Sequence, residues 1–216
     1  EDLTKARELF TDAIKEDPKY GKAAYNLAMA CQLLSDSKCT MDAFRRAIDS
    51  DATDVESRIQ YAGALIESGD PDEAIRQLTE ALRLDPRADV ALSHLARAYL
   101  DKEVWDRTIQ LADQAIAVKP QNDQAYLWKA DALRRRAAGE KDPAVKKATY
   151  AQAIETYRTY LRLTNFSTPA YESFAFHFIG FGLGSRRHAD RQIVYAYQRS
   201  LAFMGLCECE NKLGYS

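Results

Sequence analysis

Apolar residues return along the chain at two spacings, one within each helix and one between repeated units. Within a unit they follow a helical period, as in Ala24, Leu27 and Ala28, which share one helix face. Between units the step is 34 residues, because alanines stand at positions 13, 47, 81 and 115, and again at positions 28, 62, 96 and 130. A constant period of this length predicts a stack of identical supersecondary units.

Turn residues divide each unit into two helices. A second apolar face, such as Ala74, Leu78 and Ala81, follows the first. Between the two faces, Gly69 suits the end of a helix, and the pair 70–71 places an aspartate cap before a proline in the first turn of the next. The pattern therefore predicts antiparallel helix pairs, and the small residues would let the helix axes cross closely.

The unit that begins at residue 55 resembles the tetratricopeptide repeat. The resemblance rests on Tyr61, Ala62, Leu65, Gly69, Ala74, Leu78, Ala81 and Pro86. It implies an all-α fold, a right-handed superhelical solenoid of antiparallel helix pairs. Members of this family use the first helix of each repeat to line a concave groove, so the resemblance also implies protein–protein interaction.

The register assigns the whole chain to one array. Its predicted parts are the second half of a repeat (1–20), regular repeats (21–54, 55–88 and 89–122), a repeat with an 11-residue insertion (123–166), a divergent repeat (167–200) and the start of a further repeat (201–216). Because neither end resembles a polar cap, we expect a fragment of a longer protein, with self-association through the exposed repeat faces as one alternative.

The insertion lies between Leu133 and Ala153 and adds about three helical turns. It predicts two lengthened helices joined by a turn at 138–143. The insertion is basic through Arg134, Arg135, Arg136, Lys141, Lys146 and Lys147. One interpretation is a docking patch for an acidic partner, a phosphate or a nucleic acid. The other, which we favour, is a solvated extension of two helices.

The divergent repeat is rich in aromatic residues. Tyr171, Phe174, Phe178 and Phe181 follow a helical period and are interpreted as core. Three glycines at 180, 182 and 184 then predict a loop between helices. Beyond them, 188–212 has no proline or glycine before Gly205, and the sequence leaves open whether it forms one long helix or a pair of helices.

Composition restricts the classes of protein. The 216 residues are 46% hydrophobic, and 30 basic residues stand against 32 acidic ones, so a protein that coats nucleic acid along its length is disfavoured. No apolar run approaches the roughly 20 residues that span a bilayer. The four cysteines show no disulfide framework, which favours a reducing, cytoplasmic compartment. Cys31 and Cys39 flank a turn and are interpreted as small core residues, although they could come close in space.

No catalytic, metal or cofactor motif is found in the sequence. The three histidines are not paired at helical spacing, and Cys207 and Cys209 would point to opposite sides of a helix. We therefore expect a non-enzymatic protein without a cofactor or a metal site.

A second face of the first helices is predicted to bind a protein or peptide. Its candidate residues are Lys22, Tyr25, Met29, Gln32, Glu56, Ile59, Ile66, Ser93, Arg97, Gln124, Leu127, Asp131 and Arg134. Apolar and aromatic side chains alternate here with isolated charges, which suits an extended peptide or a partner helix. The alternative is a spacer whose groove side is simply exposed. We favour binding, because Tyr25, Ile59, Ile66 and Leu127 would otherwise be exposed apolar groups.

Overall fold

The computed structural model describes residues 2–164 and 190–214, and for 190–200 it describes the backbone alone. The described residues form ten helices and no strand, which confirms the all-α prediction. The helices are α1 (Asp2–Glu16), α2 (Gly21–Leu33), α3 (Ser37–Ser50), α4 (Val55–Glu67), α5 (Pro71–Leu84), α6 (Asp89–Asp101), α7 (Trp105–Val118), α8 (Asp123–Gly139), α9 (Pro143–Leu163) and α11 (Asp190–Leu213).

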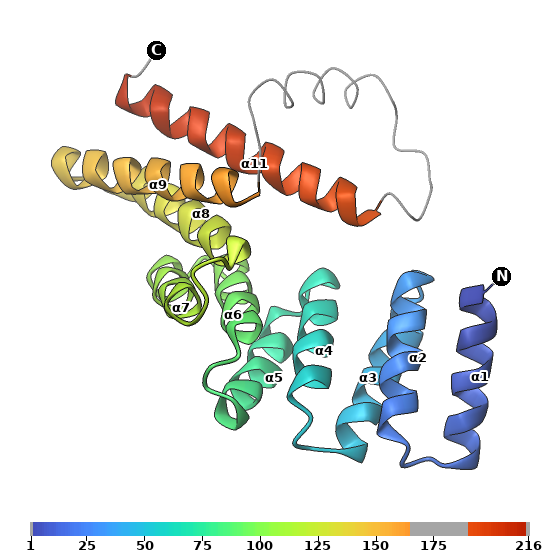
Figure 1. Ribbon diagram of the computed structural model, residues 1–216. Helices are drawn as coiled ribbons and strands as arrows, with labels where there is room; N and C mark the ends of the chain where they lie inside the picture. Colours follow the sequence, from blue (N-terminus) through green and yellow to red (C-terminus); the bar gives the residue numbers. More distant parts are fainter. Residues whose placement is uncertain (1, 165–189, 215–216) are drawn as a thin grey trace. The chain divides into compact units, whose positions relative to one another are not determined.

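The helices belong to two compact units, Glu1–Lys102 and Glu103–Ser216, called unit 1 and unit 2. In unit 1 each helix packs on the next along the chain, from α1 to α6, and α4 also contacts α6 (Figure 1). In unit 2, α8 packs against α7 and α9, and α11 packs against α9 and α8. Within each unit, the arrangement is the predicted stack of helices that contact their neighbours.

The alanine columns lie where the helices cross. Ala28, Ala62, Ala96 and Ala130 on the first helices are each 0% exposed. Ala81 and Ala115 on the second helices are fully buried as well. A larger side chain at these positions would push the helix axes apart, so the columns fix the close spacing of the pairs.

The turn between the two helices of a pair has the same backbone in three repeats. Ser35, Gly69 and Glu103 stand 34 residues apart and all have positive φ, at 59°, 83° and 60°. After Gly69, the Asp70 backbone N–H donates to the Leu65 carbonyl at 2.9 Å, as in a Schellman motif. Glycine adopts this left-handed conformation without cost, whereas Ser35 and Glu103 adopt it against their intrinsic preference.

Aspartates cap the second helices of unit 1. The side chain of Asp36 accepts from the Cys39 N–H, and that of Asp70 accepts from the Glu73 N–H, each at 3.1 Å. The next position in this register is Val104, whose side chain cannot cap α7. Its backbone (φ −95°, ψ 73°) nonetheless resembles that of Asp36 (φ −93°, ψ 84°). The start of α7 is therefore shaped for a cap that it lacks.

The insertion lengthens two helices, as predicted. α8 has 17 residues and α9 has 21, whereas α2 to α7 have 13 or 14 each. The turn falls at 140–142, inside the predicted segment. The predicted aromatic core and glycine loop of 171–184 lie outside the described residues. The sequence left open whether 188–212 forms one helix or two. From Asp190 onward it is the single helix α11, which is continuous across the predicted repeat boundary at 200 and 201.

We predict that Val104→Asp supplies the missing cap of α7. The free energy of unfolding should rise by about 0.5–1 kcal/mol, because a carboxylate would accept from an otherwise unsatisfied N–H of the first turn. Urea denaturation followed by circular dichroism measures the change. Asp70→Ala serves as the converse and should lower the free energy by about 1 kcal/mol. Equal stability of both variants and the parent would refute the role given to these caps.

Candidate functional site

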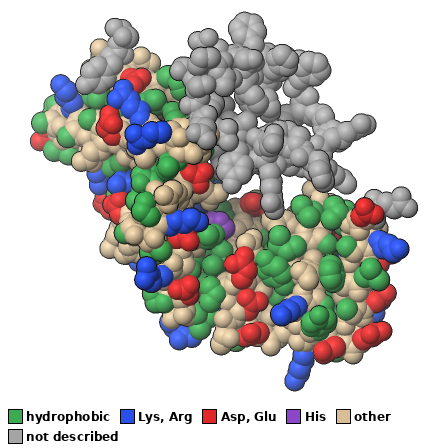
Figure 2. Space-filling model, in the orientation of Figure 1, with side chains coloured by type: hydrophobic (Ala, Val, Ile, Leu, Met, Phe, Trp, Pro, Cys, Tyr) green, Lys and Arg blue, Asp and Glu red, His purple; other side chains and the backbone are tan. Residues whose placement is uncertain are grey.

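The first helices of unit 1 present a partly open face. Lys22 and Glu56 are exposed, while Tyr25, Met29 and Arg97 are partly exposed. Figure 2 shows hydrophobic side chains gathered over the helices nearest the N-terminus, bordered by acidic side chains. This face therefore offers the mixture of apolar and charged groups that the sequence predicts, at fewer positions than expected.

Several predicted groove residues are buried. Ile59, Ile66, Ser93 and Leu127 have between 1% and 9% of their surface exposed. The expectation that the three apolar ones would be exposed is therefore wrong. The first helices α4 and α6 contact each other, and α8 contacts α11, so a side chain at this offset can lie between two helices. Of the remaining candidates, Gln32, Gln124, Asp131 and Arg134 are partly exposed.

Tyr25 joins this face to the core of unit 1. Its ring packs edge-on against Phe44, with ring centroids 6.0 Å apart, and Phe44 in turn contacts Tyr61. The pKa of the Tyr25 hydroxyl is raised, first by burial and then by the negative charges of Glu56 and Asp54. An aromatic ring beside two carboxylates suits a cationic group, which both the ring face and the carboxylates attract.

His94 on α6 lies over Gly63 on α4. A Cβ at Gly63 would be 3.4 Å from His94 Cε1, at the near edge of ordinary van der Waals contact, so the ring lies directly over this position. A ring N–H of His94 donates to the Ile59 carbonyl, whereas Nδ1 is buried without a hydrogen-bond partner. Burial lowers the pKa of His94, and the positive charge of Arg97 lowers it further. The neutral imidazole is therefore the form that the folded unit accommodates.

Three arginines of the basic insertion contact groups of unit 2. Arg134 donates to Glu208 at 2.9 Å, and Arg136 donates to Asp106 at 2.9 Å. The Arg135 guanidinium lies 5.5 Å from the centre of the Trp105 ring. Lys146 lies near the carbonyl oxygens at the end of α8, and Lys141 and Lys147 are exposed. These contacts between helices give the three arginines a structural role.

A polar cluster around the buried Tyr157 joins α8, α9 and α11. The Tyr157 hydroxyl donates to Asp131 at 2.6 Å and accepts from Arg134 Nε at 3.3 Å. Burial, followed by the charge of Asp131, raises the pKa of Tyr157 well above its usual value. Burial alone would lower the pKa of Arg134, but Tyr157 and Asp131 together raise it. Both groups therefore keep their protons, which satisfies the cluster.

Gly205 of α11 makes room for this cluster. A Cβ at Gly205 would be 2.5 Å from the Tyr157 hydroxyl oxygen, too close for any non-bonded contact. Glycine inside a helix costs about 1 kcal/mol relative to alanine. The close approach of Tyr157 explains why α11 has a glycine at this position. The sequence alone did not reveal this contact.

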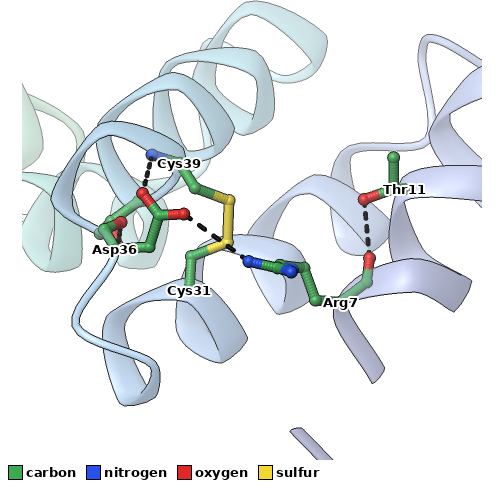
Figure 3. The surroundings of a disulfide bond; sticks show 6 residues. Arg7, Thr11, Cys31, Asp36 and Cys39 are labelled. Atoms are coloured by element: carbon green, nitrogen blue, oxygen red, sulfur yellow. Dashed lines mark hydrogen bonds and ion pairs between the residues drawn. A yellow bond between two sulfur atoms is a disulfide. The ribbon is translucent and has the colours of Figure 1, made fainter. Parts of the chain in front are cut away.

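Cys31 and Cys39 form a disulfide (Figure 3). The interpretation of both as merely small core residues is therefore wrong, and the alternative that they come close in space is confirmed. The bond joins the end of α2 to the first turn of α3, with Cα atoms 5.7 Å apart. A disulfide also removes the observation on which the expectation of a reducing compartment rested.

The described ranges contain neither a membrane-spanning helix nor a metal-binding cluster. None of their helices is both long and apolar enough to cross a membrane. Across residues 2–164 and 190–214, the His, Cys, Asp and Glu side chains form no group placed to hold a metal ion. Cys209 is buried, and burial raises the pKa of its thiol to about 12.

Comparisons with known proteins agree with the fold. Residues 65–107 match the model of the tetratricopeptide repeat family. No curated protein matches the sequence. The crystal structure of MamA resembles this fold with a TM-score of 0.65. The two sequences are 17% identical, and the match covers 76% of this chain and 90% of that one. YrrB, described as a TPR protein with an unusual peptide-binding site, is 14% identical, with a TM-score of 0.61 and coverage of 76% and 84%.

We predict that unit 1 loses stability in mild acid because of His94. Its folded-state pKa lies below the unfolded value of about 6.5, so the unfolded chain binds the proton first. The loss should begin as the pH falls through the unfolded pKa and level off below the folded one. Denaturation at about pH 7.5 and about pH 5.5 measures it. In His94→Gln the difference should shrink; an unchanged difference would assign the effect to other groups.

We also predict that Gly205→Ala destabilises unit 2. The clash with Tyr157 should cost about 1–3 kcal/mol, which exceeds the gain of about 1 kcal/mol in helix propensity. Gly139→Ala is the matched control, because a Cβ there has no neighbour within 4 Å. Thermal unfolding should show a lower midpoint for the first variant and an equal or higher one for the second. A gain in both would mean that the helix tolerates alanine beside Tyr157.

Proposed function

We propose that the chain is a protein–protein interaction module of the tetratricopeptide repeat kind. Residues 65–107 match the model of that family, and the fold resembles those of MamA and YrrB. Its binding face is the side of α2, α4 and α6 that carries Lys22, Tyr25, Met29, Glu56 and Arg97. The occupant is an extended peptide or a segment of a partner protein. YrrB, which shares the fold, is described as having a peptide-binding site, and this supports the general mode of binding.

The observation that carries the proposal is the partly exposed Tyr25 ring beside Glu56 and Asp54. Burial is the main cause that raises the pKa of the Tyr25 hydroxyl, and the negative charges of Glu56 and Asp54 raise it further. The Tyr25 ring packs edge-on against Phe44, so the side chain is already oriented before a ligand binds. A lysine or arginine of the partner fits this place, because its charge meets the carboxylates while its stem packs on the ring.

The charge of unit 1 supports a basic partner. Its sequence holds 14 basic and 20 acidic residues, a formal charge of −6, whereas unit 2 holds 16 basic and 12 acidic residues, a charge of +4. An acidic surface attracts basic peptides over distances of about a Debye length, roughly 10 Å at 0.1 M salt. The partner that we propose for unit 1 therefore combines basic and apolar side chains.

The basic insertion is not the site that we propose. Docking of a phosphate or a nucleic acid there would use arginines that already contact Glu208, Trp105 and Asp106. Breaking such contacts would cost part of the binding energy. Lys141 and Lys147 are exposed and could contact a phosphate. Two lysines alone would contribute little to the binding of a nucleic acid.

We predict that peptides selected from a displayed random library against the whole chain carry lysine or arginine next to apolar residues. Glu56→Lys should weaken the affinity of a selected peptide, measured by fluorescence anisotropy, about tenfold or more. Glu8→Lys on α1 makes the same change of charge on another exposed position and should change the affinity less than about twofold. Equal losses in both variants would show a general charge effect and contradict the site.

Tyr25→Ala tests the aromatic half of the same site. Loss of the ring should reduce the binding free energy of the selected peptide by about 1–2 kcal/mol, as for a typical anchor residue. Tyr20→Ala is the matched control, because Tyr20 is 49% exposed and precedes α2. Retention of affinity in Tyr25→Ala, with the fold verified by circular dichroism, would exclude Tyr25 as an anchor.

A further inference from the structure

The disulfide stands where other repeats have a bulky packing residue. Cys31 shares its register with Leu65 and Leu133, which are 5% and 2% exposed. Both leucines are therefore core residues of their helix pairs. Cys31 is fully buried, yet a thiol side chain is smaller than that of leucine. In this repeat the covalent bond to Cys39 therefore holds the helices where an apolar contact holds them elsewhere.

Three structural elements meet at the disulfide. Cys39 lies in the first turn of α3, and its backbone N–H donates to Asp36, which caps that helix. The other oxygen of Asp36 pairs with Arg7 of α1, at 3.7 Å. Figure 3 shows Arg7 reaching from α1 toward Asp36. Opening the bond would therefore loosen the end of α2, the start of α3 and the link to α1 together.

The two sulfur atoms differ in access. Cys31 is 0% exposed, whereas Cys39 is partly exposed. A thiolate from solution therefore reaches Cys39 Sγ first, with Cys31 Sγ as the leaving group in the interior. Once reduced, position 31 holds a thiol side chain smaller than the leucine of other repeats, and the end of α2 is no longer joined covalently to the start of α3.

We propose that Cys31–Cys39 is a redox-responsive clasp that controls the order of α1, α2 and α3. A small-molecule or protein dithiol opens it. One thiolate of the dithiol attacks Cys39 Sγ, the S–S bond breaks, and Cys31 leaves as a thiolate that takes up a proton. The second thiol attacks the mixed disulfide and releases the Cys39 thiol. The protein disulfide gains two electrons, and the dithiol becomes a disulfide.

Hydrogen–deuterium exchange of the whole chain, with and without dithiothreitol, tests the clasp. Reduction should speed the exchange of amides in α2 and α3 by about one to two orders of magnitude, as expected for the loss of a short disulfide loop. Amides of α5 should keep their rates, because α5 packs beyond α4. Alkylation before reduction should leave Cys31 and Cys39 unlabelled.

Two variants separate the clasp from a general effect of the reductant. Cys31→Ala with Cys39→Ala should exchange quickly in both conditions. Cys31→Leu with Cys39→Glu places the residues that stand at 65 and 73 into the same register, and should exchange slowly in both. The proposal is overturned if α2 and α3 exchange equally before and after reduction, or if both thiols are labelled in the unreduced protein.

Discussion

Close crossing of paired helices is the constraint on which each unit depends. A buried alanine column runs through the first helices and another through the second, and both keep the period of the repeat. Because a methyl group is all that fits at each crossing, the helix pairs take the same spacing in successive repeats. The identity of most other positions is then free to vary, provided that an apolar stripe faces the neighbouring helix.

The features specific to this protein lie at positions where a residue departs from the repeat pattern. A cysteine stands in the column of Leu65, the imidazole of His94 lies beside the glycine at position 63, and Tyr157 occupies the place that Ala112 has in the preceding repeat. Each departure brings a group with its own chemistry: a bond that thiols can break, a base that titrates in mild acid, and a buried phenol. The regular scaffold holds these groups in position.

The sequence predicted the helix pairs, their turns and the lengthened α8 and α9, because period and turn residues are local signals. It did not predict which groove residues are buried. Ile59 and Leu127 lie at the same register position as Tyr25 on their helices, and only packing against neighbouring helices distinguishes their exposure. It also missed the pairing of Arg134 with Glu208, 74 residues away, since no local pattern connects such distant positions. Eight residues separate Cys31 from Cys39, and that spacing left their pairing open.

The neighbour-by-neighbour contacts of unit 1 have a mechanical consequence. The contacts of α2 are with α1 and α3, and those of α6 are with α5 and α4. A disturbance at one end must pass through several interfaces in series, and each interface absorbs part of it. Tyr25 and Arg97, at opposite ends of unit 1, are therefore energetically insulated from each other, so one end can be remodelled while the other keeps its shape.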